Sequence, residues 1–299
     1  MGLFDKIFSG GGKSNSEGRG VKLDVAKRFE VNRHAFHGTM SKFHKVTDYK
    51  TNEIFGIKLL DTEKTRLFRE RFKDMNAPAE GDIGMDIDHP LVAKTLQYGT
   101  TRTGQEYIIT EWINGPGMNV LIKNEAPELK PVRLVMIKKM AEALQAVHDA
   151  GFIHRDICPR NYICTKDLKS IKLIDFGLTV PDKPEFCRPG NRTGTPQYMS
   201  PEVIRRRPTD KRLDLFSFGV TMYRMLTFEH PWGSTDTTGM AALAHDQRPA
   251  TDIYEHRPNL NESLAKLVHW CLEIDKDNRM PNCKRLRQEL KYVRSEEGK

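Results

Sequence analysis

The sequence predicts an α+β fold in two lobes, a small antiparallel sheet followed by a mainly helical lobe. Short runs of β-favouring residues are concentrated within residues 21–114, whereas apolar residues at helical spacing dominate residues 115–299. A chain of 299 residues is also long enough for about two domains, at roughly 100 to 200 residues each. We expect a flexible tail over residues 1–20 ahead of the two lobes.

Five β-favouring runs, separated by glycine and polar residues, make up the first lobe. A charged stretch from Thr62 to Asp86 lies between the third run and the fourth, and we expect it to be helical. The five expected strands are RFEV (28–31), FHKVTD (43–48), NEIFGIKLL (52–60), LVAKTLQYG (91–99) and EYIITEW (106–112).

The helices of the second lobe are predicted from apolar stripes. Within residues 131–148 apolar side chains recur at intervals of three and four, Pro131 stands at the start, and Gly151 follows the end. This pattern is typical of an amphipathic helix whose apolar stripe faces a core. Similar patterns predict helices over residues 214–228, 261–273 and 281–294.

Composition and charge exclude several classes of protein. Hydrophobic residues make up 38% of the chain, enough for a core, and no run approaches the ~18 apolar residues of a membrane span, which excludes channels and transporters. The formal charge of +8 attracts anions, but zinc-finger spacing and an aromatic RNA-binding strand are missing, so we expect no nucleic-acid partner. The five scattered cysteines form no CxxC pair and predict a reduced, cytoplasmic protein.

The tail carries two weak signals. Apolar side chains within residues 1–8 share one face at helical spacing and would suit contact with a membrane surface or a partner. A frayed terminus is the simpler interpretation, because fewer than ~12 residues form only a marginal helix. Residues 10–14 read GGGKS and imitate the end of a Walker A motif, but no strand precedes them, and we discard that interpretation.

The residues with the clearest chemistry lie in two neighbouring segments, FIHRDICPRNYIC (152–164) and SIKLIDFG (170–177). Asn161 follows Asp156 by five positions, and Asp175 follows Asp156 by 19. This spacing resembles the catalytic loop and the metal-binding loop of the protein kinase family. Phosphoryl transfer from ATP needs metal ligands and a carboxylate that orients the attacking hydroxyl. The resemblance implies that Asn161 and Asp175 hold Mg²⁺ and that Asp156 is the carboxylate.

The resemblance extends over about residues 28–294 and implies a two-lobed protein-kinase-like fold, with ATP and Mg²⁺ as cofactors. The segment FGIK (55–58) occupies the place of V-A-I-K in the family. Lys58 therefore resembles the lysine that holds the α- and β-phosphates of ATP. A lone lysine in a strand would carry no such meaning.

In the family this lysine pairs with a glutamate on a helix. Glu80 stands nine residues before His89, where kinase sequences have that acid, and Glu70 is the rival. We favour Glu80, although the two glycines that follow it, each costing up to ~1 kcal/mol relative to alanine, make its surroundings a poor helix.

The nucleotide base is expected at the end of the fifth run. Thr110, Glu111 and Ile113 stand where the family has the gatekeeper and the hinge whose backbone groups hold adenine. The glycine-rich loop, G-x-G-x-x-G-x-V in the family, reads FHGTMSKF over residues 36–43, so only Gly38 remains of its glycines. We expect this loop to cover ATP loosely, or to need a conformational change before it closes.

Residues 194–202 read GTPQYMSPE and resemble the end of the activation segment of protein kinases. The resemblance implies a set of structural contacts in the second lobe. Glu202 is expected to pair with Arg279, and Asp214 to anchor the catalytic loop from a buried helix. His154 is expected to pack under the catalytic and metal-binding loops rather than to act as a base.

Regulation by phosphorylation is expected in the same segment. Arg155 directly precedes the catalytic Asp156, and an arginine there pairs with a phosphate on the activation loop of kinases. Thr193 is the expected acceptor of that phosphate, whereas Thr195 is expected to contact Asp156 and to stay unmodified.

The catalytic loop departs from the family at Cys158, where Ser/Thr kinases have a lysine that reaches the transferred phosphate. Arg160 is expected to supply that charge instead. Cys158 and Cys164 suggest a redox or metal pair, but inert buried thiols are the commoner interpretation.

The sequence thus favours a protein Ser/Thr kinase that acts on protein hydroxyls. The alternative is a pseudokinase, a nucleotide-binding scaffold or signalling module, although such proteins commonly lose one of Lys58, Asp156, Asn161 or Asp175, and all four are present. A small-molecule kinase is disfavoured by the complete activation segment. The basic run at residues 205–207 is either a solvated face or part of a docking site for an acidic substrate.

Overall fold

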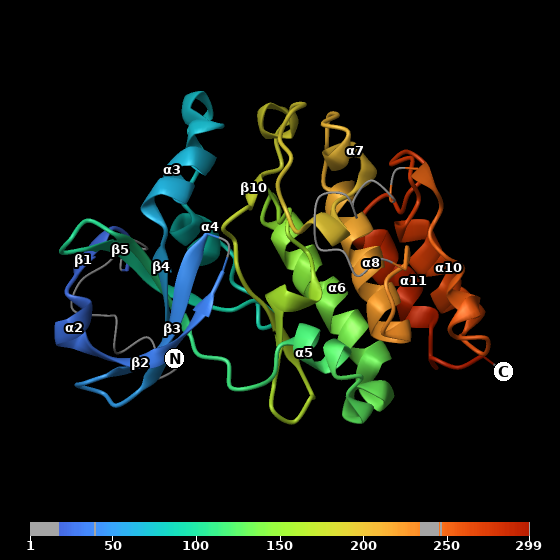
Figure 1. Ribbon diagram of the computed structural model, residues 1–299, viewed down its shortest axis with the longest axis horizontal. Helices are drawn as coiled ribbons and strands as arrows, with labels where there is room; N and C mark the ends of the chain where they lie inside the picture. The colour runs from blue at the N-terminus through green and yellow to red at the C-terminus, as the bar shows by residue number, and fades with distance from the viewer. Residues whose placement is uncertain (1–17, 39, 234–244, 246, 299) are drawn as a thin grey trace. The chain divides into compact units, whose positions relative to one another are not determined.

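The computed structural model describes residues 18–38, 40–233, 245 and 247–298, and the chain divides into two compact units (Figure 1). Unit 1 consists of Met1–Asp88 and Ala93–Trp112, and unit 2 of His89–Val92 and Ile113–Lys299. The contacts expected of residues 1–8 lie outside the described residues.

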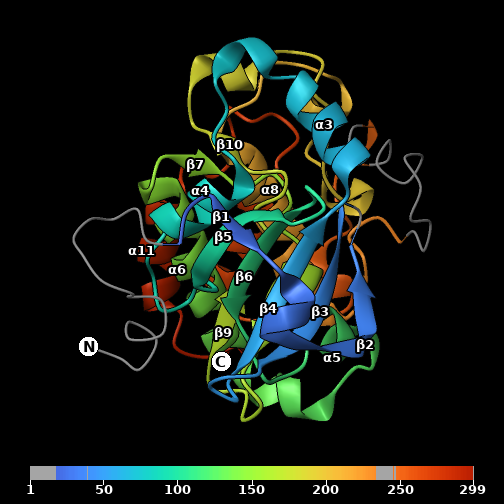
Figure 2. The same cartoon turned by 90° about the vertical axis from the view of Figure 1, so that its left-hand side faces the viewer.

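Unit 1 is built on a six-stranded sheet with the strand order β1-β5-β6-β4-β3-β2 (Figure 2). The strands β2 to β6 pair antiparallel, as predicted. The edge strand β1 is an addition to the prediction and pairs parallel with β5. The strands are β1 (Val21–Leu23), β2 (Phe29–His37), β3 (Ser41–Asp48), β4 (Ile54–Leu60), β5 (Thr95–Thr101) and β6 (Glu106–Glu111).

The alternation of side chains along β4 separates the core face of the sheet from its opposite face. Phe55 and Ile57 are fully buried and belong to the core cluster of the unit, with side chains from β1, β2, β3, β5 and β6. Because neighbouring residues of a strand point to opposite faces, Gly56 and Lys58 lie on the other face of the sheet.

Gly56 makes room on that face for an aromatic ring. A Cβ atom at Gly56 would lie 2.2 Å from Cζ of Phe43 and 2.9 Å from Oγ1 of Thr110. The Phe43 ring is also stacked with Trp112, at 6.3 Å between ring centroids. The ring therefore has little room to move away from an added methyl group.

Replacing Gly56 by Ala is expected to lower the free energy of unfolding by about 1 to 3 kcal/mol, because the methyl group overpacks the site. Urea unfolding checks this. In the Phe43→Val background the same substitution should cost much less, because the smaller side chain leaves the space open. Equal costs in both backgrounds would contradict the assignment of the clash to Phe43.

The helices of unit 1 differ from the single helical stretch predicted over Thr62–Asp86, and that prediction was wrong. Asn76 adopts a left-handed conformation (φ 49°) and Pro78 has no N–H to donate, so the helix cannot continue through this region. The structure has α2 (Val25–Arg28), α3 (Thr62–Glu70), the 3₁₀ turn η1 (Lys73–Met75) and α4 (Glu80–Asp86).

Unit 2 is mainly helical, and the four helices predicted for it are present with ends within two residues of the prediction. Short helices and two-residue or three-residue strand pairs, which carry little periodic signal, were not predicted. The α-helices are α5 (Met118–Lys123), α6 (Arg133–Asp149), α7 (Pro201–Ile204), α8 (Arg212–Thr227), α10 (Glu262–Cys271) and α11 (Cys283–Tyr292). The strands are β7 (Phe152–Ile153), β8 (Tyr162–Cys164), β9 (Ile171–Leu173) and β10 (Val180–Pro181), and the 3₁₀ turns are η2 (Pro127–Val132), η3 (Pro159–Asn161), η4 (Pro184–Cys187), η5 (Pro196–Tyr198) and η6 (Ile253–Glu255).

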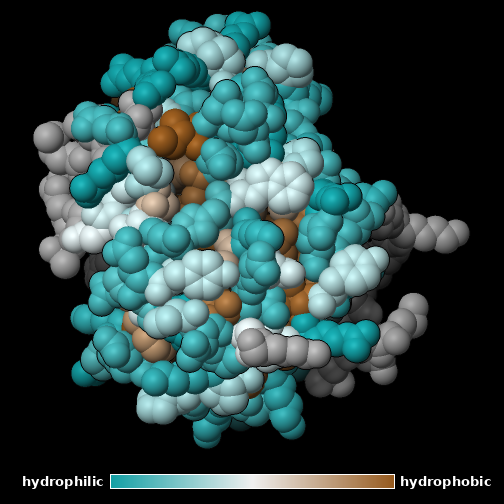
Figure 3. Space-filling view, turned by 90° about the vertical axis from the view of Figure 1, so that its right-hand side faces the viewer, coloured by the Kyte–Doolittle hydropathy of each residue, from teal (hydrophilic) through white to brown (hydrophobic). Residues whose placement is uncertain are grey.

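The core of unit 2 forms where α8 packs against α6 and α10, and where α6 packs against α11. The starts of α10 and α11 carry side-chain caps, since Asn261 accepts from the Leu264 N–H and Asn282 from the Arg285 N–H. None of the helices in the described part of the chain is long and apolar enough to cross a bilayer. Hydrophobic residues reach the face seen in Figure 3 only in small, separate areas.

Candidate active site

A short hairpin in unit 2 brings the two expected metal ligands together. The strands β8 and β9 pair antiparallel, and Asn161 directly precedes β8. The Ile174 N–H, just after β9, donates to the Asn161 carbonyl over 2.9 Å, and Asp175 is the next residue. An antiparallel pair places the start of one strand beside the end of the other, so the hairpin holds Asn161 and Asp175 at the same end.

Asp156 is held through both of its carboxylate oxygens. Its Oδ1 accepts from the Thr195 hydroxyl over 2.7 Å and from the Thr195 N–H over 2.9 Å. Its Oδ2 accepts from Asn161 Nδ2 over 3.0 Å and lies 3.6 Å from Nη2 of Arg160. The expected contact with Thr195 is therefore present, and the carboxylate has a defined orientation.

The oxygen donors at the hairpin fit a magnesium ion. Nδ2 of Asn161 donates to the Asp156 backbone carbonyl over 2.7 Å and to the Asp156 carboxylate over 3.0 Å, which leaves the amide oxygen for another partner. Asp175 adds a carboxylate. Mg²⁺ commonly takes only one or two protein ligands and completes its shell with water and phosphate oxygens. Among the described residues, no group of three or more His, Cys, Asp or Glu is placed to hold a metal ion.

Asp214, fully buried on α8, anchors the loop that carries Asp156, as expected. Its carboxylate accepts from the backbone N–H groups of His154 and Arg155, each over 2.8 Å, and lies 2.9 Å from Nε2 of His148. Burial acts to raise the pKa of Asp214, but the hydrogen bond from His148 and the other contacts outweigh it and hold that pKa below its usual value. The loop is thus tied to the helical core through its backbone.

Two non-glycine residues of the site have left-handed backbone conformations, Arg155 with φ 67° and Asp175 with φ 69°. Such conformations cost roughly 1 to 3 kcal/mol and persist only where the surroundings impose them. The Gly177 N–H supports the left-handed conformation of Asp175 by donating to its Oδ1 over 3.1 Å. His154 is fully buried and packs against Phe176, with ring centroids 5.6 Å apart, which confirms its structural place beneath both loops.

Cys158 and Arg160 occupy different environments although both belong to the catalytic loop. Cys158 is 1% exposed, and burial raises the pKa of its thiol to about 12. Burial also raises the pKa of Cys164 to about 12, so both thiols stay protonated, as expected of inert cysteines. The Arg160 side chain is about half exposed, and its Nη2 donates to the Thr195 hydroxyl over 3.1 Å.

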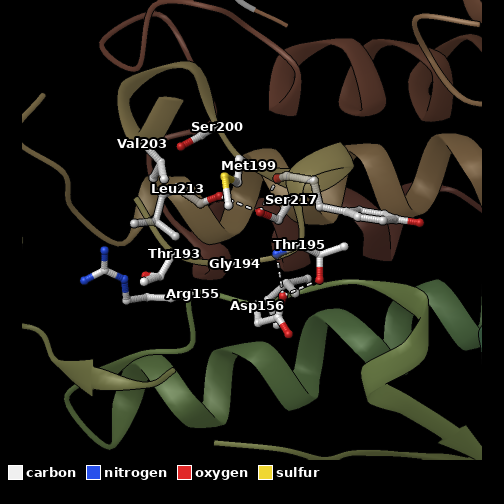
Figure 4. Close-up of a pocket in the computed structure, with 12 residues that line it drawn as sticks. Arg155, Asp156, Thr193, Gly194, Thr195, Met199, Ser200, Val203, Leu213 and Ser217 are labelled. Atoms are coloured by element: carbon white, nitrogen blue, oxygen red, sulfur yellow. Dashed lines mark hydrogen bonds between the residues drawn. The ribbon is translucent and has the colours of Figure 1, made fainter. Parts of the chain in front are cut away.

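A cavity of about 10 Å³ adjoins Asp156 and is lined in part by Arg155, Thr193, Thr195 and Ser217 (Figure 4). The Thr193 hydroxyl is buried there, and it has no hydrogen-bond partner within the described chain. A space of this size holds about one water molecule. The segment around Thr193 and Thr195 therefore lies against the loop that carries Asp156, with the hydroxyl of the expected phosphate acceptor turned inward.

In unit 1, Lys58 pairs with Glu80 and not with Glu70. The Lys58 ammonium lies 2.5 Å from a Glu80 carboxylate oxygen, and both side chains are nearly buried. Glu80 is the first residue of α4, where the helix dipole favours a negative charge. Glu70 instead pairs with Lys73 on the exposed surface.

The other residues expected to bind the nucleotide lie at two places. Thr110 and Glu111 are the last two residues of β6. This strand pairs with β4, and Thr110 lies opposite Gly56. Ile113 is the first residue of unit 2 after this strand. Gly38 is exposed between β2 and β3, and its N–H donates to the Ser41 carbonyl over 2.9 Å, so in this structure it closes a turn.

Two histidines support residues 197–199, and the sequence did not indicate this role for them. His230 and His245 lie with ring centroids 5.8 Å apart and hydrogen-bond to the carbonyls of Gln197 and Met199. Burial lowers the pKa of each to about 4, so both are neutral at physiological pH. They support residues 197–199, and isolated histidines in an irregular region gave no pattern from which this could be predicted.

Comparison with known proteins agrees with this geometry. The family model described as "Protein kinase domain" matches residues 29–290. A probable serine/threonine-protein kinase of Clostridium perfringens is 28% identical over 276 residues, covering 91% of this chain and 39% of the relative. Serine/threonine-protein kinase pkn3 of Myxococcus xanthus is 27% identical, covering 92% and 52%, and PknB of Mycobacterium leprae is 25% identical, covering 91% and 44%. The chain spans about half, or less, of the length of these relatives.

Proposed function

Because this chain belongs to the protein kinase family, we propose that it is an ATP-dependent Ser/Thr protein kinase that phosphorylates protein hydroxyls. The observation that carries the proposal is the geometry of Asp156, whose carboxylate is oriented by Thr195 on one oxygen and by Asn161 on the other. Relatives named serine/threonine-protein kinases support the choice of acceptor. We expect a cytoplasmic location, where the five unpaired cysteines would remain reduced.

The proposed roles divide between the two units. In unit 1, Lys58, oriented by Glu80, holds the α- and β-phosphates of ATP, Gly38 belongs to the loop that covers them, and Thr110 and Glu111 hold the base. In unit 2, Ile113 continues the hinge. Mg²⁺, held by Asn161 and Asp175, would neutralise negative charge on the phosphates.

Asp156 acts on the protein substrate. Its carboxylate accepts a hydrogen bond from the attacking hydroxyl and so orients the hydroxyl oxygen toward the phosphate. The same carboxylate receives the hydroxyl proton as transfer proceeds. The hydrogen bonds from Thr195 and Asn161 fix this carboxylate in advance, so its orientation need not be gained during the reaction.

Arg160 is proposed to replace the missing lysine of the catalytic loop, and Arg160→Ala is expected to lower turnover about tenfold or more. A hydrogen bond from a cation to the moving phosphate is worth ~1.5 to 3 kcal/mol, and the Arg160 guanidinium is already within 3.6 Å of Asp156. Steady-state kinetics with Mg-ATP and a peptide substrate give the measurement.

The matched variant is Cys158→Lys, which should raise turnover only slightly because the charge is already supplied. A large gain from Cys158→Lys together with a silent Arg160→Ala would show that the lost lysine was never replaced.

The proposed activity is tested by incubating the protein with Mg-ATP and mapping phosphate by mass spectrometry. We expect autophosphorylation, with Thr193 among the sites, because Arg155 lines the same cavity and would pair with the phosphate once the threonine turns outward. Phosphate confined to Ser14 or Ser16 would contradict the role of Thr193. No transfer to the chain itself or to a general protein substrate would favour the pseudokinase alternative.

A further inference from the structure

The helix that carries Glu80 has little to stabilise it internally. α4 is seven residues long, contains Gly81 and Gly84, and has no side-chain cap at its N-terminus. Its remaining charges, Asp82 and Asp86, are four residues apart and therefore lie on one face, where like charges repel. The position of α4 must come from contacts outside the helix.

Arg19 supplies such a contact from the N-terminal side of the chain. Its Nη1 lies 2.6 Å from Asp82 Oδ1, and its Nη2 lies 2.7 Å from Asp86 Oδ1. One guanidinium thus bridges two successive turns of α4 and offsets the repulsion between the two aspartates. The planar fork of arginine suits this double contact better than a single ammonium would.

The segment that carries Arg19 is itself attached to the sheet. The Tyr98 N–H donates to the Gly18 carbonyl over 2.8 Å, and Val21 in β1 lies opposite Gly99 in β5. Gly99 permits this approach, since a Cβ there would lie 2.0 Å from the Val21 carbonyl oxygen. The register of β1 on β5 therefore determines where Arg19 stands.

Tyr98 connects the same strand to α4 directly. Its hydroxyl donates to Asp82, the carboxylate that Arg19 also holds. Its ring packs on Gly81, where an added Cβ would lie 2.2 Å from Cγ of the ring. The glycine that weakens α4 as a helix is thus what lets the helix lie close to β5.

We propose that residues 18–23 form an N-terminal clamp in which Arg19 is a positioning residue that holds α4 and, through it, keeps Glu80 on Lys58. The clamp lies before the residues matched by the family model, which begin at residue 29. Resting on the proposed kinase activity, the clamp makes phosphate binding by Lys58 dependent on a segment outside the matched domain.

The test compares Arg19→Ala, Arg19→Lys and the control Arg102→Ala in the full chain. Arg102 pairs with Asp24 over 3.1 Å, so the control removes an ion pair of the same N-terminal region that does not touch α4. Two readouts are used, hydrogen exchange of the α4 amides and kinetics of phosphate transfer with varied ATP.

Arg19→Ala is expected to speed exchange in α4 and to lower kcat/KM for ATP about three- to tenfold, because partly exposed ion pairs of this kind are individually modest. Arg19→Lys should recover part of both effects, and Arg102→Ala should change neither. Combining Arg19→Ala with Asp86→Asn should cost less than the sum of the two, because they remove one shared contact.

Wild-type exchange and kinetics in Arg19→Ala would overturn the clamp, as would an equal loss in Arg102→Ala. If Arg19→Ala does not fold, as judged by urea unfolding, exchange in Arg19→Lys decides the question. Absence of activity in the wild-type protein would contradict the proposed function alone, because exchange in α4 still tests the clamp.

Discussion

Replacing Asp175 by Ala is expected to reduce phosphate transfer at least about 100-fold while leaving the chain folded. Asp175 is one of the two oxygen donors at the end of the β8–β9 hairpin, and an alanine there cannot hold the cation that neutralises charge on the phosphates. The fold should persist with some loss of stability, because alanine leaves the pairing of β8 with β9 intact but loses the hydrogen bond from Gly177 and is strained at φ 69°. Transfer of labelled phosphate from Mg-ATP gives the rate, and urea unfolding gives the stability.

Asp167→Ala is the matched control for this substitution. Asp167 is an exposed acid in the turn between the same two strands, at the end of the hairpin away from Asn161. It should leave the rate unchanged. Lys58→Met should behave like Asp175→Ala, and more than a few per cent of wild-type turnover in either variant would show that the assigned roles are wrong.

Glu202→Ala is expected to lower the free energy of unfolding by about 3 to 5 kcal/mol, because it leaves a buried cation without its partner. Arg279 is 2% exposed, and its two terminal nitrogens pair with the two Glu202 oxygens over 2.8 and 2.9 Å. Nε donates to the Glu273 carbonyl over 2.9 Å. The terminal nitrogens also donate to the carbonyls of Arg212 and Ile274 over 3.0 and 3.2 Å. These carbonyl contacts hold the guanidinium in place, so it cannot reach water when Glu202 is lost.

Urea unfolding measures this effect, with Glu63→Ala as the control. Glu63 forms a similar pair with Arg66, but both side chains are more than half exposed. The control should leave the unfolding midpoint unchanged, because water replaces the partner of an exposed charge. Similar shifts for the two variants would mean that the buried pair does not stabilise unit 2 as described.

For residues that lie close together in the sequence, the spacing alone indicated that they would meet, whereas their roles were implied by a resemblance. Asp156, Asn161 and Asp175 fall within 20 residues, and a single loop followed by a hairpin brings them together. The four long helices of unit 2 were predicted for a related reason, since an apolar stripe is repeated over several turns and tolerates local exceptions. The stretch 62–86 has no such repeat, and its division into separate helices was missed.

Contacts between distant segments were decided by the tertiary structure. Sequence left Glu70 as a rival of Glu80, and the choice became clear only when the structure placed the Glu80 carboxylate within 2.5 Å of the Lys58 ammonium. The pairing of Glu202 with Arg279, 77 residues apart, could be expected only from a resemblance, and nothing in the sequence indicated that Arg19 would reach α4 across 63 residues. Local spacing restricts what neighbours along the chain can do, whereas a side-chain pair across a fold depends on sheet register and helix packing, which are determined by the burial of many residues at once.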